Sequence, residues 1–296
     1  MEQFNDNQLA FIQCDESSLL LASAGTGKTK SIAAKVSRLI KEKHLDAKKI
    51  LCLSFTNKAC DEMKERVLGD VGGDALPATI KTFHAFCFQI ISEEKIRTTG
   101  LFPEEVIYDE DDCSEVVKSV TPLDSGAVLK FIDFIKEKRI SDQYFVNDEA
   151  SDLIDTANNL DQEGLIKLEN ALGKKLQALA VTLLDQKETL LSGYEHALEE
   201  NHALDFNDLV SGVYRLFKDD SLVKRWQERY SFICIDEAQD TSLSEYRLLQ
   251  KLFGGSQIVL CGDFFQTIYQ WRGSEPDLII REFRDRYAPQ EFSFDV

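Results

Sequence analysis

A run of leucines followed by a loop of small residues constrains the fold more than any other part of the chain. Residues 19–31 read LLLASAGTGKTKS, so that an apolar run, a glycine-rich turn and a helical pattern follow one another. Gly25 and Gly27 allow successive backbone N–H groups to point at one anion, and the positive end of the following helix adds to the attraction. The stretch fits the Walker A pattern, except that Ala22 stands at its first glycine. We expect a phosphate-binding loop here, with a chance glycine-rich turn as the alternative.

The side chains of this loop suit a nucleotide bound with Mg²⁺. Lys28 can reach the β- and γ-phosphates, and the hydroxyl group of Thr29 can ligate Mg²⁺. The residues expected to hold the nucleotide are Ala24, Gly25, Thr26, Gly27, Lys28, Thr29 and Lys30.

A second apolar run ends in two carboxylates. Residues 232–240 read FICIDEAQD, which places Asp236 and Glu237 directly after a predicted strand. Beside a phosphate-binding loop, the first carboxylate can hold Mg²⁺ and the second can act as general base on an attacking water. Taken alone, the pair could equally be a solvated loop end. With the Walker A pattern it indicates a nucleotide hydrolase, in which Lys28, Asp236 and Glu237 are catalytic.

Apolar runs and helical patterns alternate in both end regions of the chain. The apolar runs at 19–22, 50–55, 232–235 and 257–261 are typical of strands buried on both faces of a parallel sheet. Residues 28–42 and 57–68 have apolar positions at helical spacing, and Asn57 is the expected N-cap of the second helix. This alternation predicts an α/β fold, a parallel sheet flanked by helices.

The middle of the chain differs in pattern and in charge. Residues 109–203 have long helical periodicity and few strand candidates, which predicts a mainly α-helical domain inserted between two halves of one α/β domain. Residues 101–220 carry 11 Lys and Arg against 27 Asp and Glu, whereas residues 1–100 carry 14 against 13. The net charge of −18 therefore comes mostly from the middle. The near-neutral flanks can still form a basic groove for nucleic acid.

Other classes of protein fit the composition poorly. The chain has no run of about 18 apolar residues and no export signal at its start, so we expect a cytoplasmic protein without a membrane partner. Seven cysteines are scattered without a CxxC pair. Their spacing argues against a zinc site or a disulfide framework and predicts reduced thiols in the core.

Seven segments together resemble the N-terminal motor half of the superfamily 1A DNA helicases, the UvrD/Rep family, in their order and spacing. The segments similar to the Q motif and to motifs I, Ia, Ib, Id, II and III are FNDNQ (4–8), ASAGTGKT (22–29), LSFTNKACDEMKERV (53–67), TFHAFC (82–87), LDFNDLV (204–210), IDEAQDTS (235–242) and GDFFQTIYQWRG (262–273). The resemblance implies an ATP-driven translocase that unwinds DNA in the 3′ to 5′ direction. Its cofactors would be ATP and Mg²⁺, and its partner single-stranded DNA.

The resemblance also assigns roles to single residues. Gln8 stands where the family recognises adenine, and its amide has the donor and the acceptor that this requires. Gln266 stands where the family contacts the γ-phosphate, and we add it to the catalytic residues. Aromatic rings can stack on any base, although core packing is the alternative for each of them. The residues that the resemblance places at DNA are Phe55, Thr56, Asn57, Thr82, His84, Phe206, Tyr269, Trp271 and Arg272.

The family's domain organisation implies two domains here. A RecA-like P-loop NTPase domain (1A) is expected from residues 1–101 and 204–296, and a helical domain (1B) from residues 102–203. The family's second RecA-like domain (2A, with 2B) supplies arginines across the ATP cleft and has no counterpart in these residues. The strand-like EFSFDV at 291–296 suggests a chain cut where another domain begins. We expect ATP binding, weak DNA binding and little ATPase or unwinding activity from these residues alone.

Two other functions fit part of the sequence. A nucleotide-gated protein-interaction module could retain the helicase fold and use its acidic insert to contact a basic partner. A P-loop kinase for a small molecule would share the phosphate-binding loop, but it gives no reason for the segments at 53–67 and 262–273 to occur together.

Overall fold

The computed structural model describes residues 4–23, 25–144, 177–264 and 276–294. By their internal contacts they form two compact units. The sheet unit comprises the described parts of residues 1–86, 217–268 and 274–296, and the helical unit comprises the described parts of residues 87–216.

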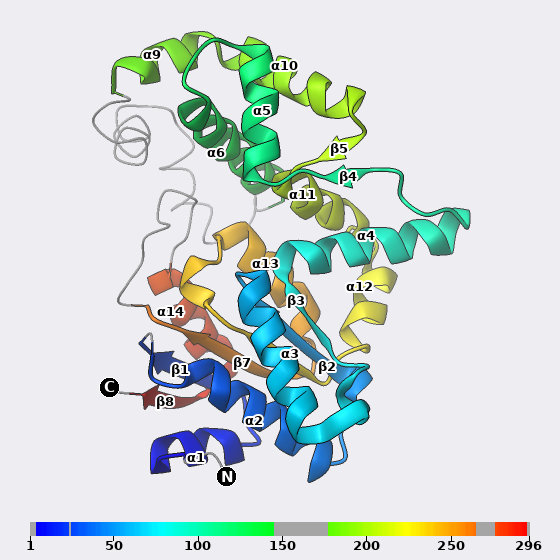
Figure 1. Cartoon of the computed structure of the whole chain (residues 1–296), viewed down its shortest axis with the longest axis vertical. Coiled ribbons are helices and arrows are strands. Elements are labelled where there is room, and N and C mark those ends of the chain that lie inside the picture. The colour runs from blue at the N-terminus through cyan, green and yellow to red at the C-terminus, as the bar shows by residue number, and fades with distance from the viewer. Residues whose placement is uncertain (1–3, 24, 145–176, 265–275, 295–296) are drawn as a thin grey trace. The chain divides into compact units, whose positions relative to one another are not determined.

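Six parallel strands form the sheet in the described part of the sheet unit (Figure 1). In spatial order they are β3 (Thr79–Thr82), β2 (Ile50–Ser54), β6 (Phe232–Ile235), β7 (Gln257–Gly262), β1 (Ser18–Ala22) and β8 (Gln290–Phe294). Four of these strands lie at the four predicted apolar runs, which confirms the predicted α/β fold with a parallel sheet. Because parallel strands end at the same edge of a sheet, the segments that follow β1 and β6 lie along one edge.

The two edge strands carry weaker sequence signals. Strand β3 has the mixed sequence TIKT and was not predicted, since only Ile80 is fully buried. Strand β8, predicted from EFSFDV, pairs with β1 so that Leu20 lies opposite Phe292. It therefore forms one edge of the sheet in the described residues.

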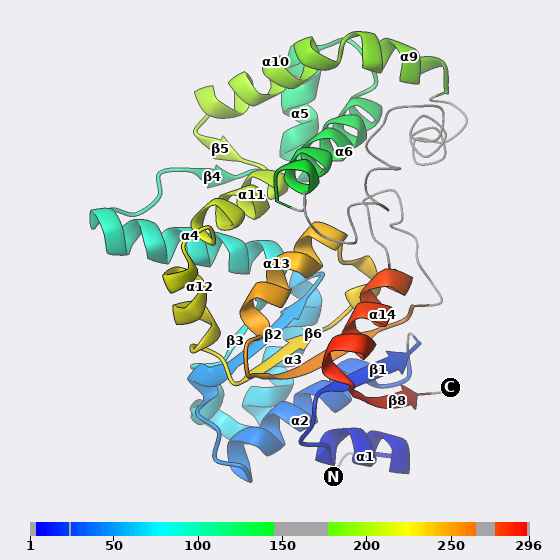
Figure 2. The same ribbon diagram turned by 180° about the vertical axis from the view of Figure 1, so that it is seen from behind.

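Helices cover both faces of the sheet. The core residues place α1 (Asp6–Gln13), α2 (Lys28–Lys41) and α3 (Asn57–Val71) on one face (Figure 1), and α13 (Leu243–Phe253) and α14 (Pro276–Tyr287) lie on the other (Figure 2). Helix α12 (Asp220–Gln227) precedes β6, and α4 (Phe83–Thr99) follows β3. Short 3-10 turns occupy Ala47–Lys49, Gly72–Ala75 and Ala238–Asp240.

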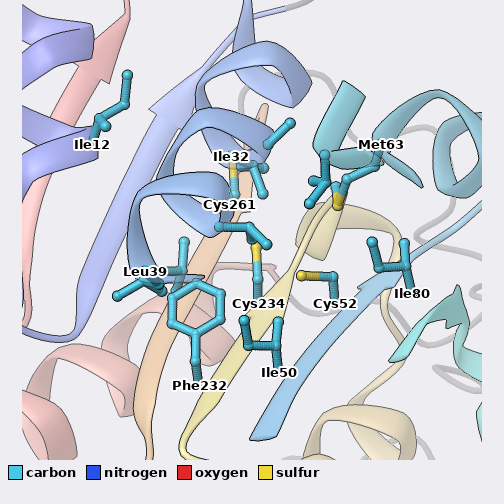
Figure 3. Packing of buried hydrophobic residues seen from close by; sticks show 14 of the residues in the cluster. Ile12, Ile32, Leu39, Ile50, Cys52, Met63, Ile80, Phe232, Cys234 and Cys261 are labelled. Atoms are coloured by element: carbon cyan, nitrogen blue, oxygen red, sulfur yellow. The ribbon is translucent and has the colours of Figure 1, made fainter. Parts of the chain in front are cut away.

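The core under α2 and α3 is built from alternate residues of the strands. Figure 3 shows Cys52, Cys234 and Cys261 from β2, β6 and β7 facing Ile32 and Met63 of the helices. Cys52 and Cys234 are directly paired in register. All seven cysteines are free thiols, and six are buried, as predicted for core thiols.

The predicted N-cap of α3 is wrong by one residue. Thr56 has an extended backbone, and its side-chain oxygen accepts a hydrogen bond from the N–H of Ala59 at 3.1 Å. Asn57 is already the first helical residue. Because both residue types are good caps, only the backbone conformation distinguishes them.

The helical unit has its own core. It contains α5 (Glu110–Val120), α6 (Ser125–Tyr144), α9 (Gln177–Asp185), α10 (Lys187–Glu200) and α11 (Phe206–Leu216), and a short parallel pair, β4 (Val106–Ile107) with β5 (Ala203–Leu204). The apolar core includes Val117, Phe131, Ile132, Leu190 and Tyr194. In the described residues of 109–203, the helical periodicity of the sequence therefore corresponds to helices that share a core.

The compact units divide the chain at other positions than the expected domains 1A and 1B. The divisions fall between Phe86 and Cys87 and between Leu216 and Phe217. A physical reason is that the helical unit includes the later part of α4, where Ile91 packs closely on Gly212 of α11. The domain assignment itself stays a prediction.

A membrane-spanning helix would have to be long and apolar throughout, and none of the helices in the described residues meets that requirement.

Candidate nucleotide-binding site

The loop after β1 has the backbone that its glycines predict. Gly25 and Gly27 have φ values of 84° and 82°, in the left-handed region that favours glycine. Gly27 is also the residue that precedes α2, which begins at Lys28. A side-chain carbon at Gly27 would lie 2.9 Å from Nε2 of Gln8. The loop therefore turns directly into the positive end of a helix, with little space beside its second glycine.

Lys28 lies between the two predicted carboxylates. Its Nζ atom is 2.5 Å from Oε2 of Glu237 and 3.5 Å from Oδ1 of Asp236. Burial works against the charge of this lysine, but the two carboxylates outweigh that effect and raise its pKa above the ordinary value. The strand–loop–helix at residues 18–41 and the end of β6 thus meet, although the residues are more than 200 positions apart in the sequence.

Only one of the two carboxylate oxygens of Asp236 accepts a hydrogen bond in the described residues. Oδ1 accepts the N–H of Glu237 at 3.0 Å. Oδ2 is buried and has no hydrogen-bond partner among the described residues. Burial raises the pKa of this carboxyl to about 6, although the ammonium of Lys28 opposes the shift. A buried carboxylate oxygen without a donor is costly, and a hard cation such as Mg²⁺ is a fitting partner for it.

Glu237 has an unusual backbone. Its φ and ψ are 56° and 40°, a left-handed conformation that is uncommon outside glycine. The strand therefore ends abruptly, and the Glu237 side chain, 32% exposed, reaches Lys28. Strained backbone of this kind is concentrated at functional sites.

Gln239 is a residue of this site that the sequence analysis missed. Its Nε2 donates to Oε2 of Glu237 at 2.9 Å and to Oδ2 of Asp240 at 3.1 Å, and its Oε1 accepts the N–H of Asp263 at 3.0 Å. Gly262 has no side chain here because an added carbon would lie 2.4 Å from that Oε1. The segments after β6 and β7 are therefore joined by one amide. Only the position of Gln239 inside DEAQD could have indicated this.

Two further carboxylates near this amide were also missed. Burial and the neighbouring Glu237 raise the pKa of Asp240 to about 6. Oδ2 of Asp263 is buried without a hydrogen-bond partner in the described part of the chain. Neither residue follows an apolar run as directly as Asp236 does, which is why the sequence did not single them out.

Comparison with known proteins identifies the family. Residues 4–288 match the UvrD/REP helicase N-terminal domain. The chain belongs to this family. The predicted resemblance to UvrD/Rep-like helicases is thereby confirmed.

Curated relatives of this UvrD/REP family chain are helicases by name. It is 31% identical over 291 residues to a "Probable DNA helicase II homolog" of Mycoplasma capricolum subsp. capricolum, an alignment covering 97% of this chain and 38% of that protein. It is also 31% identical over 289 residues to "ATP-dependent DNA helicase PcrA" of Staphylococcus aureus (strain Mu50), covering 96% and 36%. The chain thus spans less than half the length of these relatives.

Gln8, which the sequence predicts to be the Q-motif glutamine, lies beside the P-loop. Nε2 of Gln8 donates to the carbonyl of Thr26 at 2.9 Å, and Oε1 accepts the N–H of Asn5 at 3.0 Å. The second bond belongs to a capping box, since the side chain of Asn5 accepts the N–H of Gln8. Gln8 therefore connects the start of α1 to the phosphate-binding loop.

The two threonines predicted to hold DNA phosphates both cap helices. Thr56 caps α3, and the hydroxyl oxygen of Thr82 accepts the N–H of Ala85 in α4 at 3.3 Å. Strands β2 and β3 are neighbours with Ser54 opposite Thr82. The helices that follow them therefore begin along one edge of the sheet. Helix N-termini attract anions such as phosphate.

His84 contacts protein groups in this structure. Its Nε2 lies 3.1 Å from Oε1 of Glu245, and its ring meets Phe83 edge-to-face. Glu245 also accepts the N–H of Ser242, the cap of α13. His84 therefore connects the start of α4 to that of α13.

The other predicted residues are distributed over both units. Phe55, Asn57, Thr29 and Lys30 lie in the sheet unit, Asn57 exposed and the other three half-buried. The ammonium of Lys30 lies 4.6 Å from the ring centroid of Phe4. Phe206 is half-buried at the start of α11 in the helical unit. The predicted residues outside the described part are Ala24, Gln266, Tyr269, Trp271 and Arg272.

Proposed function

We propose that this chain is the ATP-binding part of an ATP-dependent DNA helicase that moves along single-stranded DNA in the 3′ to 5′ direction. One observation carries the proposal: Lys28 of the P-loop lies between Asp236 and Glu237 at the end of β6. Membership of the UvrD/REP family and the names of its relatives support the choice of ATP and DNA. Their remaining length supports a larger motor of which this chain forms a part.

Mg²⁺ fits the residues present. The unpartnered Oδ2 of Asp236 and the hydroxyl of Thr29 would hold it, and the ion would neutralise the phosphate charge. Lys28 would exchange its contacts with the carboxylates for contacts with the phosphates. That exchange would release Glu237 to accept a proton from the attacking water, while Gln239 holds its carboxylate in place.

DNA would lie along the edge where α3 and α4 begin. Thr56, Asn57 and Thr82 would bind backbone phosphates there, because capped helix N-termini present N–H groups and positive charge. Phe55, His84, Phe206, Tyr269 and Trp271 would stack on bases, and Arg272 would bind phosphate. Stacking reads no base identity, so we expect binding of any sequence.

The remaining parts of the proposal concern partners. A second motor domain (2A, with 2B) would supply arginines that close over the γ-phosphate, a contribution of about 10³–10⁵ in rate for related phosphoryl transfers. Gln266 would report the γ-phosphate to the DNA side. We further propose that the sheet and helical units correspond to domains 1A and 1B, and that the protein acts in the cytoplasm.

Lys28→Ala tests the nucleotide site. We expect it to weaken binding of a fluorescent ATP analogue in the presence of Mg²⁺ by at least about thirtyfold, because a charge-assisted phosphate contact is lost. Lys41→Ala, an exposed change on the same helix, is the matched control and should change nothing. Equal binding by wild type and Lys28→Ala would remove the basis of the proposal.

DNA-stimulated hydrolysis tests the motor. In a longer chain that carries the second motor domain, single-stranded DNA should strongly raise the ATPase rate, and Glu237→Gln should retain ATP while stopping hydrolysis. If DNA has no effect, and a basic protein is captured through residues 109–203 even by Lys28→Ala, the interaction-module hypothesis is correct instead.

A further inference from the structure

Lys35 is a buried lysine for which the proposed mechanism has no use. It lies on α2 about two turns after Lys28, and its exposed fraction is 0%. Its Nζ donates to the carbonyl oxygens of Phe11 at 2.8 Å and Cys14 at 2.6 Å, and it lies 4.8 Å from the ring centroid of Phe11. Burying an ammonium group costs free energy unless hydrogen bonds compensate for the lost water, and these two carbonyl oxygens supply such bonds.

The two carbonyls belong to the C-terminal end of α1. Such an end carries unpaired carbonyls and partial negative charge, and the last turn of α1 contains no basic residue of its own. Arg38, one turn further along α2, adds bonds to the carbonyl of Ile12 at 3.3 Å and to Asp15 at 2.8 Å. Helix α2 thus supplies the positive charge that α1 lacks.

The opposite end of α1 meets the P-loop through Gln8. This helix has eight residues, too few to be stable alone, so tertiary contacts must decide where it lies. At one end Gln8 bonds to Thr26, and at the other Lys35 bonds to Phe11 and Cys14. Both contacts lead back to the P-loop and the helix that follows it.

We propose that Lys35 is a positioning residue for nucleotide binding, which holds the C-terminal turn of α1 and thereby keeps the amide of Gln8 beside the P-loop. The inference rests on the proposed function, since it requires that Gln8 recognise the base of the nucleotide. Lys35 contacts neither the P-loop backbone nor the carboxylates in the described structure. Its removal should therefore weaken base-dependent binding and leave phosphate binding largely intact.

Displacement of a fluorescent adenine nucleotide by ATP and by inorganic tripolyphosphate separates these two parts of the affinity. For the 296-residue chain, Lys35→Met should weaken ATP binding about tenfold and tripolyphosphate binding less than about twofold. Gln8→Ala should show the same pattern. Both changes would remove the same contact. The double variant should therefore bind ATP at most about twofold more weakly than either single variant.

The control is Lys41→Met, the same substitution at an exposed position of α2, which should leave both ligands unaffected. Equal losses for ATP and tripolyphosphate, or additive effects of the two single changes, would contradict the role of Lys35 while leaving the proposed function intact. If wild type binds ATP no more tightly than tripolyphosphate, base recognition by Gln8 and the role of Lys35 are both wrong.

A second variant covers the case in which Lys35→Met does not fold, as judged by circular dichroism. Arg38→Met removes the neighbouring contacts at a less buried position and should weaken ATP binding about threefold with tripolyphosphate unchanged. No change in ATP binding for this variant would then overturn the proposal.

Discussion

Each unit of the molecule contains a lysine buried between two carboxylates. In the sheet unit Lys28 lies between Asp236 and Glu237, and in the helical unit Nζ of Lys136 lies 2.5 Å from Asp205 and 2.8 Å from Asp208. Both lysines are less than a tenth exposed. The charges are alike, so any difference in role must come from their surroundings.

The cluster in the helical unit is largely satisfied by local bonds. Asp205 and Asp208 cap α11 reciprocally, each accepting the backbone N–H of the other. The hydroxyl of Tyr194 donates to Oδ2 of Asp205 at 3.2 Å. The cluster thus joins α6, α10 and α11, and its acceptors are engaged by groups of the protein.

The cluster of Lys28, Asp236 and Glu237 in the sheet unit contains an acceptor without a hydrogen-bond donor in the described part of the chain. Oδ2 of Asp236 has no partner in the described residues, and Glu237 has a strained backbone. A raised pKa does not separate the clusters, because burial raises the pKa of both Asp236 and Asp208 to about 6. An unpartnered acceptor and a strained residue therefore indicate function better than charge or pKa does.

The largest effect is expected from Lys136→Met. It leaves two buried carboxylates without their cation and should lower the free energy of unfolding of the helical unit by about 3–5 kcal/mol. Urea denaturation followed by hydrogen exchange of α6 and α10 measures this loss. Lys118→Met, at an exposed ion pair of α5, is the control and should cost less than about 1 kcal/mol. A similar small cost for Lys136→Met would mean that its cluster is not structural.

The opposite sign is expected from Asp236→Asn. Removing a buried charge whose second oxygen is unpartnered should raise the free energy of unfolding of the sheet unit at pH 7 by about 1–3 kcal/mol. The same variant should lose Mg²⁺-dependent nucleotide binding. Asp74→Asn, an exposed change, should alter stability by less than about 0.5 kcal/mol. If Asp236→Asn instead destabilises the sheet unit, the carboxylate of Asp236 is structural, and the two clusters do not differ in role.

The pH dependence gives an independent check on Asp236. Its pKa is raised from 3.8 to about 6 in the folded chain, so between these values the folded state holds a proton that the unfolded state has released. The free energy of unfolding should therefore fall as the pH rises through that window. Urea denaturation at pH 4 and pH 7 should show a smaller fall for Asp236→Asn than for wild type. Equal falls would mean that other groups account for it.

The smallest effect is expected from Tyr194→Phe. It removes one donor to Asp205 and leaves the ring in the core, so the helical unit should lose about 1 kcal/mol. Thermal unfolding of this variant beside Lys136→Met would rank the hydroxyl and the ammonium as partners of the same carboxylate. If Tyr194→Phe destabilises the helical unit as much as Lys136→Met does, the hydroxyl of Tyr194 is the main stabilising partner of Asp205.

The candidate site could be predicted from the sequence where one short segment carries the whole signal. The glycines that require a left-handed backbone, Lys28 after them, and the acidic pair after an apolar run are all local patterns. The helix cap at Thr56 could not be distinguished from Asn57, because both residue types are good N-caps and the general preference even favours asparagine. Gln239 was missed because its partners come from two strands.

The alternation of four buried strands with helices, the P-loop and the acidic strand end could be predicted from the amino-acid sequence alone, since apolar periodicity and glycine conformation act over a few residues. Only the tertiary structure decided that β8 pairs with β1, that Lys35 holds α1, and that Lys136 joins Asp205, because these contacts connect residues far apart in the chain. In each of these three contacts, a polar group that has no partner in its own helix or strand bonds to a group of a different element.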